Sequence, residues 1–125
     1  MNSKKDIGRL GEAKAVDFLL NKGYRIIQKN FHSHWGEIDI IAKKDSKVAF
    51  IEVKTRIGLL KGKPYESVDK RKLQKLMRPI QFYLLQNHLK DYKLSLDVIS
   101  IVLNYDLRLD KIIHFENVLQ DISKK

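Results

Sequence analysis

Two apolar runs separated by a short polar link, 37–42 and 47–54, constrain the fold of this chain more than any other feature. Charged residues recur at alternate positions within them, which is the period of β-strands, whose side chains alternate between two faces. Glu37 and Asp39 are therefore predicted on one face of the first strand. The apolar residues of that strand are predicted on the opposite face: Ile38, Ile40 and Ala42.

The second strand repeats the pattern, with Glu52 and Lys54 on one face. Its other face is apolar and carries Ala49, Ile51 and Val53. If the two strands pair, the carboxylates of Asp39 and Glu52 meet the ammonium group of Lys54 at the edge of a hydrophobic sheet. This arrangement suits a hard divalent cation held next to a water molecule, as in metal-dependent phosphodiesterases.

The same Glu-x-Lys triplet has a structural alternative, because a half-solvated antiparallel strand looks similar. The neighbours of Glu52 favour the functional interpretation, since Ile51 and Val53 leave it little room at the surface if both faces of the sheet are covered. Charged side chains are seldom buried without a partner or a metal ion. A covered glutamate at this position therefore points to a site.

Length and composition predict one globular domain over residues 1–125. Hydrophobic residues make up 43% of the chain and charged residues 32%, which argues against general disorder. The absence of cysteine excludes disulfides and thiolate metal sites. The first residues lack the apolar core of a signal peptide, and no apolar run reaches membrane-spanning length, so a cytoplasmic protein without a membrane partner is expected.

The positive charge is concentrated in one segment. The net charge is +10, and residues 54–78 hold nine basic residues against two acids, a net charge of +7 within that segment. A focused basic surface beside a carboxylate site fits a polyanionic substrate whose phosphate is drawn to the metal. A solvated basic helix face is the alternative. The candidate nucleic-acid contacts are Arg56, Lys61, Lys63, Lys70, Lys72 and Lys75.

The periodicity predicts an α/β sandwich in the order helix, three strands, helix and two strands. A first helix, ending at Gly23, has its apolar positions at Ile7, Leu10, Ala13, Val16, Leu19 and Leu20. The later elements are predicted as a strand at 24–28, a turn at 32–36, a hairpin link at 45–46, a helix from near Ser67 to 84, a strand at 94–103, a turn at 106–110, a strand at 112–115 and a helical tail. Pro79 should kink the second helix or mark where two helices abut.

A set of short motifs spans nearly the whole chain: Gly8-x-x-Gly11-Glu12, Gly23-Tyr24, Asn30, Gly36-Glu37-Ile38-Asp39 and Phe50-Ile51-Glu52-Val53-Lys54. In combination these motifs resemble the YraN family of small bacterial proteins, uncharacterised protein family 0102. That family in turn resembles the PD-(D/E)xK nuclease superfamily, which includes restriction endonucleases and archaeal Holliday-junction resolvases. The resemblance implies a restriction-endonuclease-like αβββαβ core, in which helices flank a central mixed sheet.

The resemblance also implies a site, position by position. Asp39 and Glu52 match the two metal-binding carboxylates of the superfamily, Lys54 matches its lysine, and Val53 would lend a backbone carbonyl to the metal. Glu12 matches an acidic residue that helps to bind or orient the water of the metal site. The implied cofactor is Mg²⁺ or Mn²⁺, because two carboxylates, a carbonyl and retained waters suit an octahedral oxygen shell. Lys54 could lower the pKa of the attacking water or steady the charge that develops on the phosphate.

Two positions depart from the family pattern. Ser95-Leu96-Asp97 stands where an arginine and an aromatic residue usually precede the aspartate, so a substrate contact made by that arginine is missing. His32 and His34 occupy a loop that usually carries arginines, where they could ligate a transition metal, contact phosphate or lie plainly at the surface. Trp35 could stack on a base, although the role of a capping core aromatic is favoured. Glu37 either assists the site or is a solvated partner of a nearby lysine.

Three functions from different classes remain. The first is a Mg²⁺-dependent endonuclease, with DNA favoured over RNA and branched or repair intermediates as substrates, through the resolvase-like relatives. The second is a non-catalytic nucleic-acid-binding module on a nuclease fold, and the third is a structural or partner-binding protein. The set of Asp39, Glu52 and Lys54 favours the first, because clustered carboxylates repel phosphate. A homodimer and a repair-complex partner both stay open.

Overall fold

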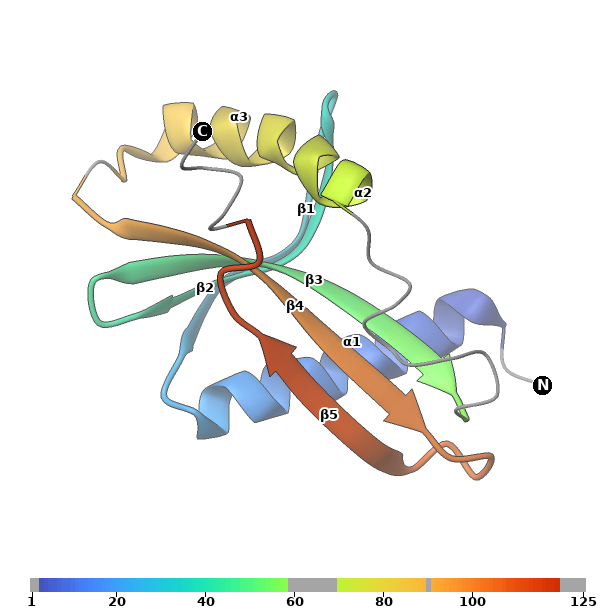
Figure 1. Ribbon diagram of the computed structural model, residues 1–125. Helices are drawn as coiled ribbons and strands as arrows, with labels where there is room; N and C mark the ends of the chain where they lie inside the picture. The colour runs from blue at the N-terminus through green and yellow to red at the C-terminus, as the bar shows by residue number, and fades with distance from the viewer. Residues whose placement is uncertain (1–2, 59–69, 90, 120–125) are drawn as a thin grey trace.

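A central sheet with helices on both faces is the architecture of the computed structural model, which describes residues 3–58, 70–89 and 91–119 (Figure 1). The elements follow in the order α1 (Lys4–Asn21), β1 (Arg25–Ser33), β2 (Gly36–Lys44), β3 (Lys47–Ile57), α2 (Lys70–Lys75), α3 (Met77–Asn87), β4 (Lys93–Leu103) and β5 (Leu109–Phe115).

The strands form one mixed sheet in the order β1-β2-β3-β4-β5. β3 and β4 run parallel, whereas the other neighbours are antiparallel. A parallel pair needs a crossover connection, and the segment that contains α2 and α3 makes it. The predicted α/β core of helix, three strands, helix and two strands is therefore confirmed.

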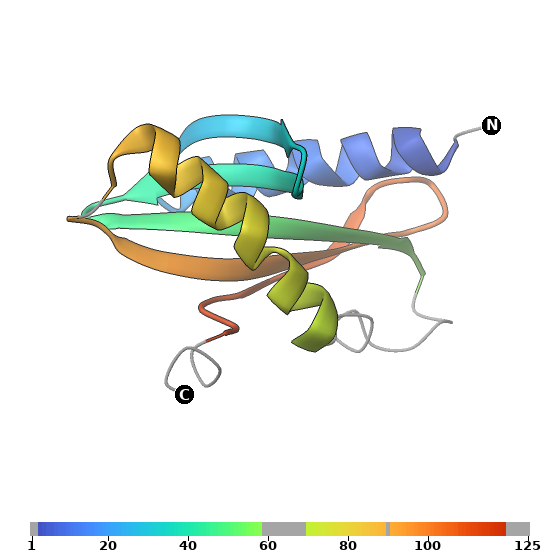
Figure 2. The same cartoon turned by 90° about the horizontal axis from the view of Figure 1, so that it is seen from above.

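Two apolar layers fill the space between the sheet and the helices. One layer joins the helical residues Leu73, Ile80 and Tyr83 to strand residues such as Phe50. The other joins α1 to the opposite face and contains Ala15, Leu19, Ile40, Ala49, Ile51 and Ile101. Figures 1 and 2 show α2 and α3 over one face and α1 under the other. β3 is thus covered on both faces along its apolar half, which is the condition under which Glu52 has little room at the surface.

Helix α1 begins with a capping box and ends in a left-handed glycine. The Ser3 side chain accepts the Asp6 N–H at 3.2 Å, and the Asp6 carboxylate accepts the Ser3 N–H at 3.3 Å, which satisfies two of the unpaired amides of a helix start. Gly23, with a φ of 96°, follows the C-cap residue and confirms the predicted stop.

The buried stripe of α1 differs from the predicted one. Gly11, Ala15 and Leu19 are buried, four residues apart, whereas Ala13 and Leu20 are exposed, contrary to prediction. The stripe is narrow because the helix lies very close to the sheet. A Cβ added at Gly11 would fall 1.9 Å from Thr55 Oγ1 and 2.8 Å from Thr55 Cβ on β3. The hydrophobic pattern gives no weight to glycine, so it could not identify this contact.

Several element boundaries also differ from the predicted ones. β1 continues to Ser33, and only two residues form the turn that follows it; β5 begins at Leu109, three residues before the predicted strand. The hairpin link at 45–46 is confirmed. The second helix is divided between α2 and α3 just before Pro79, as predicted for two abutting helices. The predicted start near Ser67 and the helical tail lie outside the described residues.

Within the described parts of the chain, none of the helices combines the length and the apolar character that crossing a membrane requires.

Candidate metal and nucleic-acid site

The candidate site forms where β2 separates from β3. The recorded pairing of these strands runs from Lys44↔Lys47 to Ile40↔Ile51, while β2 stays paired to β1 as far as Gly36. Asp39 is the first residue of β2 beyond the last pair. Its Oδ2 accepts the backbone N–H of Val53 at 2.8 Å. The Asp39 carboxylate thus accepts a backbone hydrogen bond from β3 just beyond the last residue pair between β2 and β3.

The backbone changes direction at this point, so one of the face predictions for β2 is wrong. Ile40 packs in the apolar layer between α1 and the sheet, whereas Ile38 packs in the layer between α3 and the sheet. Strict alternation would place both side chains on one face. Asn30 of β1 lies opposite Asp39, between the pairs Lys29↔Ile40 and Phe31↔Ile38. Its φ of 53° is left-handed, a conformation that asparagine adopts more readily than most residues. The β1–β2 ribbon therefore kinks at the candidate metal ligand.

A cavity of about 590 Å³ opens beside the kink. It collects side chains from α1, β1, β2 and β3, and its lining residues are Lys5, Gly8, Arg9, Glu12, Asn30, His32, Glu37, Asp39 and Val53. The two acids predicted from separate parts of the chain, Glu12 and Asp39, therefore lie in one cavity. Lys5 and Arg9 come from the same helix as Glu12 and add positive charge to its wall.

The electrostatics of the cavity disfavour a full set of ionised acids. Burial raises the pKa of Asp39 to about 6, with further increases from the nearby Glu52 and Glu37 carboxylates, against the opposing effects of the Val53 N–H and Lys54. Burial and Asp39 likewise raise the pKa of Glu12, while a hydrogen bond with Asn30 and the charge of Lys29 oppose that rise. The carboxylates are thus close enough to repel one another, and a bound cation would relieve that repulsion.

Glu52 lies on the other face of β3, near enough to Asp39 for its charge to raise the Asp39 pKa. Its side chain is 24% exposed and lies beside Leu76 and Ile80. Lys54 Nζ is 3.5 Å from Glu52 Oε1, which confirms that the two residues share a face. The structure therefore brings together all the residues predicted for catalysis and metal binding: Glu12, Asp39, Glu52, Val53 and Lys54.

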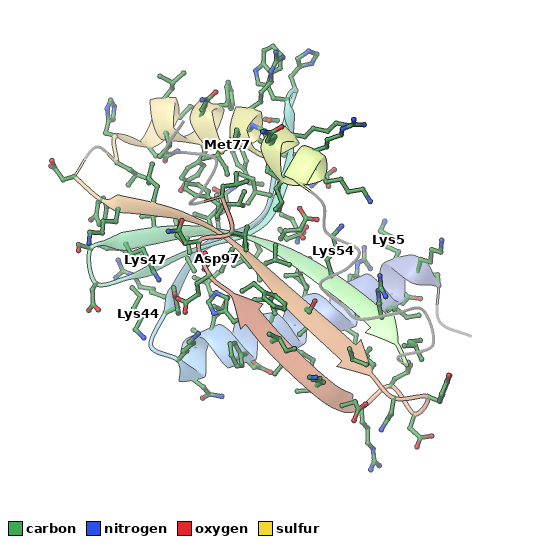
Figure 3. The ribbon with its side chains drawn as sticks, in the orientation of Figure 1. Lys5, Lys44, Lys47, Lys54, Met77 and Asp97 are labelled. Atoms are coloured by element: carbon green, nitrogen blue, oxygen red, sulfur yellow. The ribbon has the colours of Figure 1, made fainter. Side chains whose placement is uncertain are left out.

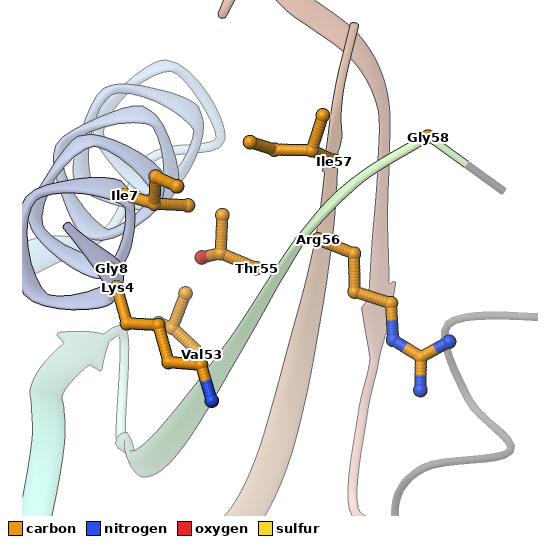
Figure 4. A pocket seen from close by; sticks show the side chains of 8 residues that line it. All are labelled: Lys4, Ile7, Gly8, Val53, Thr55, Arg56, Ile57 and Gly58. Atoms are coloured by element: carbon orange, nitrogen blue, oxygen red, sulfur yellow. The ribbon is translucent and has the colours of Figure 1, made fainter. Parts of the chain in front are cut away.

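A second cavity, of about 400 Å³, adjoins the first and is drawn in Figure 4. The two cavities share Gly8 and Val53. Lys4 and Arg56 line the second one from α1 and β3. Figure 3 shows Lys5 and Lys54 on the same side of the molecule, away from Lys44 and Lys47 at the opposite end of the sheet. Basic side chains from two elements therefore surround the approach to the acids.

The chain matches one protein family over residues 11–101, the family described as Uncharacterised protein family UPF0102. The chain belongs to this family. Relatives named UPF0102 protein include one from Persephonella marina, 44% identical over 97 residues, which cover 78% of this chain and 84% of the relative. One from Caldanaerobacter subterraneus is 40% identical over 116 residues, covering 92% and 95% of the two chains. One from Clostridium tetani is 43% identical over 117 residues, covering 89% and 96%.

The predicted nucleic-acid contacts of this UPF0102 member are placed only in part. Arg56 lies near the end of β3, Lys70 begins α2, and Lys72 and Lys75 are exposed on α2. Lys61 and Lys63 lie outside the described residues. A spacing of three places Lys72 and Lys75 on neighbouring positions of one helix face. The described part of the basic segment is thus consistent with one exposed cationic surface.

The hairpin between β1 and β2 holds the two histidines that depart from the family pattern. His32 Nδ1 lies 3.0 Å from Glu37 Oε1, and both side chains are about two-thirds exposed. Glu37 therefore has a histidine partner rather than the lysine predicted for it. Trp35 is 48% exposed, so its predicted role as a capping core aromatic is wrong.

A second polar cluster was missed by sequence reasoning. Asp97, His114 and Glu116 lie on β4, on β5 and just beyond β5, and place one ligand atom each within 4.8 Å of one another. Asp97 is fully buried, and its Oδ2 lies 2.7 Å from His114 Nε2, while Oδ1 accepts the Asn117 N–H at 2.9 Å and the Ser95 hydroxyl. The usual arginine position is therefore occupied by Ser95, a partner of Asp97.

This cluster is neutralised by protein groups. Burial on its own would raise the pKa of Asp97, but hydrogen bonds from His114, the Asn117 amide and Ser95 hold that pKa below its usual value. Lys22 Nζ lies 2.8 Å from His114 Nδ1, and Lys47 Nζ lies 3.1 Å from Glu116 Oε1. The cluster thus ties α1 to β4 and β5, which is a structural role. The signal that could have found it is the unusual Ser95-Leu96-Asp97 sequence.

Proposed function

We propose that this protein is a metal-dependent nuclease that hydrolyses phosphodiester bonds in DNA, with branched or repair intermediates as its substrates. The observation that carries the proposal is the position of Asp39. It sits at the separation of two strands, bound to the Val53 amide, with Glu12 and Glu52 close enough to affect its ionisation or be affected by it.

The donor set of this site fits Mg²⁺ or Mn²⁺. Asp39 and Glu52 offer carboxylate oxygens and Val53 a backbone carbonyl, which are the hard ligands that Mg²⁺ prefers. Burial and neighbouring carboxylates raise the pKa values of Asp39 and Glu12, and a bound divalent cation would offset both effects. When bound, such an ion would polarise the phosphate and favour deprotonation of a water molecule.

The remaining side chains have separate roles in the proposal. Lys54, 3.5 Å from Glu52, would steady the negative charge that develops on the phosphate oxygens. Glu12, with its raised pKa, would accept a hydrogen bond from the attacking water and orient it. Lys5 and Arg9 on the cavity wall would attract the DNA backbone.

A binding module without catalysis is the second candidate, and the basic residues on α2 favour it equally. The carboxylates distinguish the two candidates. Three acids around one point repel phosphate and raise the cost of ionisation, so they are disadvantageous in a protein that only binds DNA. A purely structural role is less well supported, because Glu12 and Asp39 face an open cavity in which the Asp39 charge raises the pKa of Glu12.

Cleavage of a defined DNA panel tests the proposal. Linear, nicked, flapped and four-way branched DNAs would be incubated with Mg²⁺, with Mn²⁺ and with EDTA. The combined Asp39→Ala and Glu52→Ala variant excludes contaminating nucleases, and Asp45→Asn, in the exposed turn at the far end of β2, is a matched control. Metal-dependent cutting by the wild type and Asp45→Asn alone supports the proposal. Equal cutting by the double variant, or no cutting of any DNA, refutes it.

A further inference from the structure

An exposed tryptophan lies in the turn at the tip of the β1–β2 hairpin, next to the strand that carries Asp39. Trp35 is the single tryptophan of the chain and is 48% exposed. The guanidinium of Arg78 lies 5.0 Å from the centroid of its ring, and the His34 ring meets it edge-on at 5.2 Å. A large aromatic surface in water is unfavourable by itself, so a ligand would gain by covering it.

Hydrogen bonds at the hairpin tip fix the backbone that carries this ring. The Trp35 N–H donates to Ser33 Oγ at 3.1 Å, and the Ser33 hydroxyl donates to the Gly36 carbonyl at 2.9 Å. Gly36 packs against Pro79 of α3, where an added Cβ would lie 3.5 Å from Pro79 Cγ. The turn is thus fixed both by its own hydrogen bonds and by α3. Because the backbone that carries Trp35 is already fixed, binding of a ligand to the ring would order little of the chain.

A hollow of about 330 Å³ lies beside the ring. Its walls are Trp35, Arg78, Gln81, Phe82 and Leu85, of which Leu85 is 80% exposed. This volume is at the lower end of the range of about 300–1,000 Å³ for small-ligand pockets. The hollow therefore suits one flat group of modest size with a negative charge nearby.

Trp35, at the edge of the hollow, and Asp39, in the candidate metal site, both belong to the β1–β2 hairpin. Trp35 precedes Asp39 by four residues, a separation of at most about 13 Å at the rise of an extended strand. Consecutive phosphates of one DNA strand are about 3.4 Å apart along a duplex axis. A strand with one phosphate at Asp39 therefore reaches Trp35 within about four nucleotides.

We propose that Trp35 and Arg78 form a stacking platform for an unpaired base of a single-stranded DNA segment leaving the candidate nuclease site. The proposal rests on the proposed function for its choice of ligand. Base stacking on aromatic side chains tolerates any sequence, and arginine adds a cation–π contribution. The platform would make the protein prefer DNA with single-stranded arms. An acidic peptide segment is the competing occupant.

Tryptophan fluorescence tests the platform directly, because Trp35 is the only tryptophan. The full chain would be titrated in EDTA, at one fixed salt concentration, with oligo(dT), with a blunt duplex and with poly-glutamate. Oligo(dT) should quench the emission, and the duplex and the polypeptide should not. Because the Trp35 variants lack this fluorophore, their binding would be measured by the anisotropy of dye-labelled DNA. Trp35→Ala should weaken oligo(dT) binding about 5- to 150-fold, the loss expected for one stacked base, and Trp35→Phe should restore part of it. Duplex affinity should change less than twofold.

Tyr105 provides the matched control, because it is an aromatic side chain 72% exposed in the turn between β4 and β5. Tyr105→Ala should bind oligo(dT) as the wild type does. Quenching by poly-glutamate instead of oligo(dT), or an unchanged affinity of Trp35→Ala for oligo(dT), overturns the platform. Since EDTA prevents metal-dependent cutting, these outcomes are independent of whether the protein cleaves DNA.

Discussion

Replacing Asp39 by asparagine should stabilise the metal-free protein at pH 8, because it removes a largely buried negative charge. Burial and two neighbouring acids raise the pKa of Asp39 from 3.8 to about 6. A raised carboxyl pKa means that the folded state binds the proton more tightly than the unfolded state, so the free energy of unfolding falls as the pH rises from about 4 to 6. At about 1.4 kcal/mol per pKa unit, the ionised side chain costs about 3 kcal/mol above pH 7.

Asparagine avoids this cost and still offers an oxygen to the Val53 N–H. We therefore expect Asp39→Asn to be more stable than the wild type by up to about 3 kcal/mol at pH 8 in EDTA. At pH 5 the wild type recovers about 1.4 kcal/mol through protonation, so the advantage should shrink by that amount.

Urea unfolding at pH 5 and pH 8 measures both quantities. In a parallel series with Mg²⁺ at a hundredfold excess over its dissociation constant, the wild type should gain about 2.7 kcal/mol and Asp39→Asn almost nothing. Asp45→Asn should reproduce neither effect. This prediction would be refuted if Asp39→Asn were less stable than the wild type at pH 8, or if its gain in unfolding free energy did not depend on pH. Either result would mean that burial and the nearby carboxylates do not destabilise ionised Asp39.

Three further predictions concern separate parts of the molecule. Glu52→Gln keeps the shape but removes a charge, so DNA cleavage should vanish while DNA binding, measured by anisotropy, persists or tightens. Replacing Lys72 and Lys75 by alanine should make the log–log salt slope of duplex binding shallower by about 2. Gly11→Ala should destabilise the fold through its clash with β3, whereas Gly8→Ala, with no atom within 4 Å of the new Cβ, should stabilise it by up to about 1 kcal/mol in thermal unfolding.

Each of these predictions has an outcome that contradicts it. If the Glu52→Gln protein cuts DNA as fast as the wild type, Glu52 is an ordinary residue of a half-solvated strand and not part of a catalytic site. If alanine at both Lys124 and Lys125 alters the salt slope as much as the α2 pair does, the basic segment is not a distinct binding surface. Equal effects of alanine at the two α1 glycines would mean that the helix is not held against β3 as described.

Local patterns predicted the parts of the fold that depend on local physics. The polar link at 45–46 and the alternation along β3 identified a hairpin, because turn residues and a two-residue period act over short stretches of chain. The motifs that resemble a nuclease superfamily then grouped Glu12, Asp39, Glu52 and Lys54, which the structure brings together. Their roles in catalysis stay predictions.

The parts that could not be predicted depend on contacts between distant segments. Ile38 and Ile40, on either side of Asp39, pack on opposite faces of the sheet where Asn30, on the neighbouring strand, has a left-handed backbone. Trp35 was expected to cap the core rather than to stack on a base, yet it lies exposed at a hairpin tip. The Asp97–His114 pair joins strands that meet only after folding. No single stretch of sequence contains these relationships.

The close contact between α1 and β3 affects how substitutions in evolution could alter the geometry of this site. Gly11 rests against Thr55, and Glu12 is the next residue along the helix. The separation between the Glu12 carboxyl group and Asp39 therefore depends on how deeply the helix sits on the strand. A bulkier or smaller side chain at position 55 would raise or lower the whole helix and shift one acid relative to the other. The spacing of the acids can thus be adjusted from a core position, without altering any charged residue.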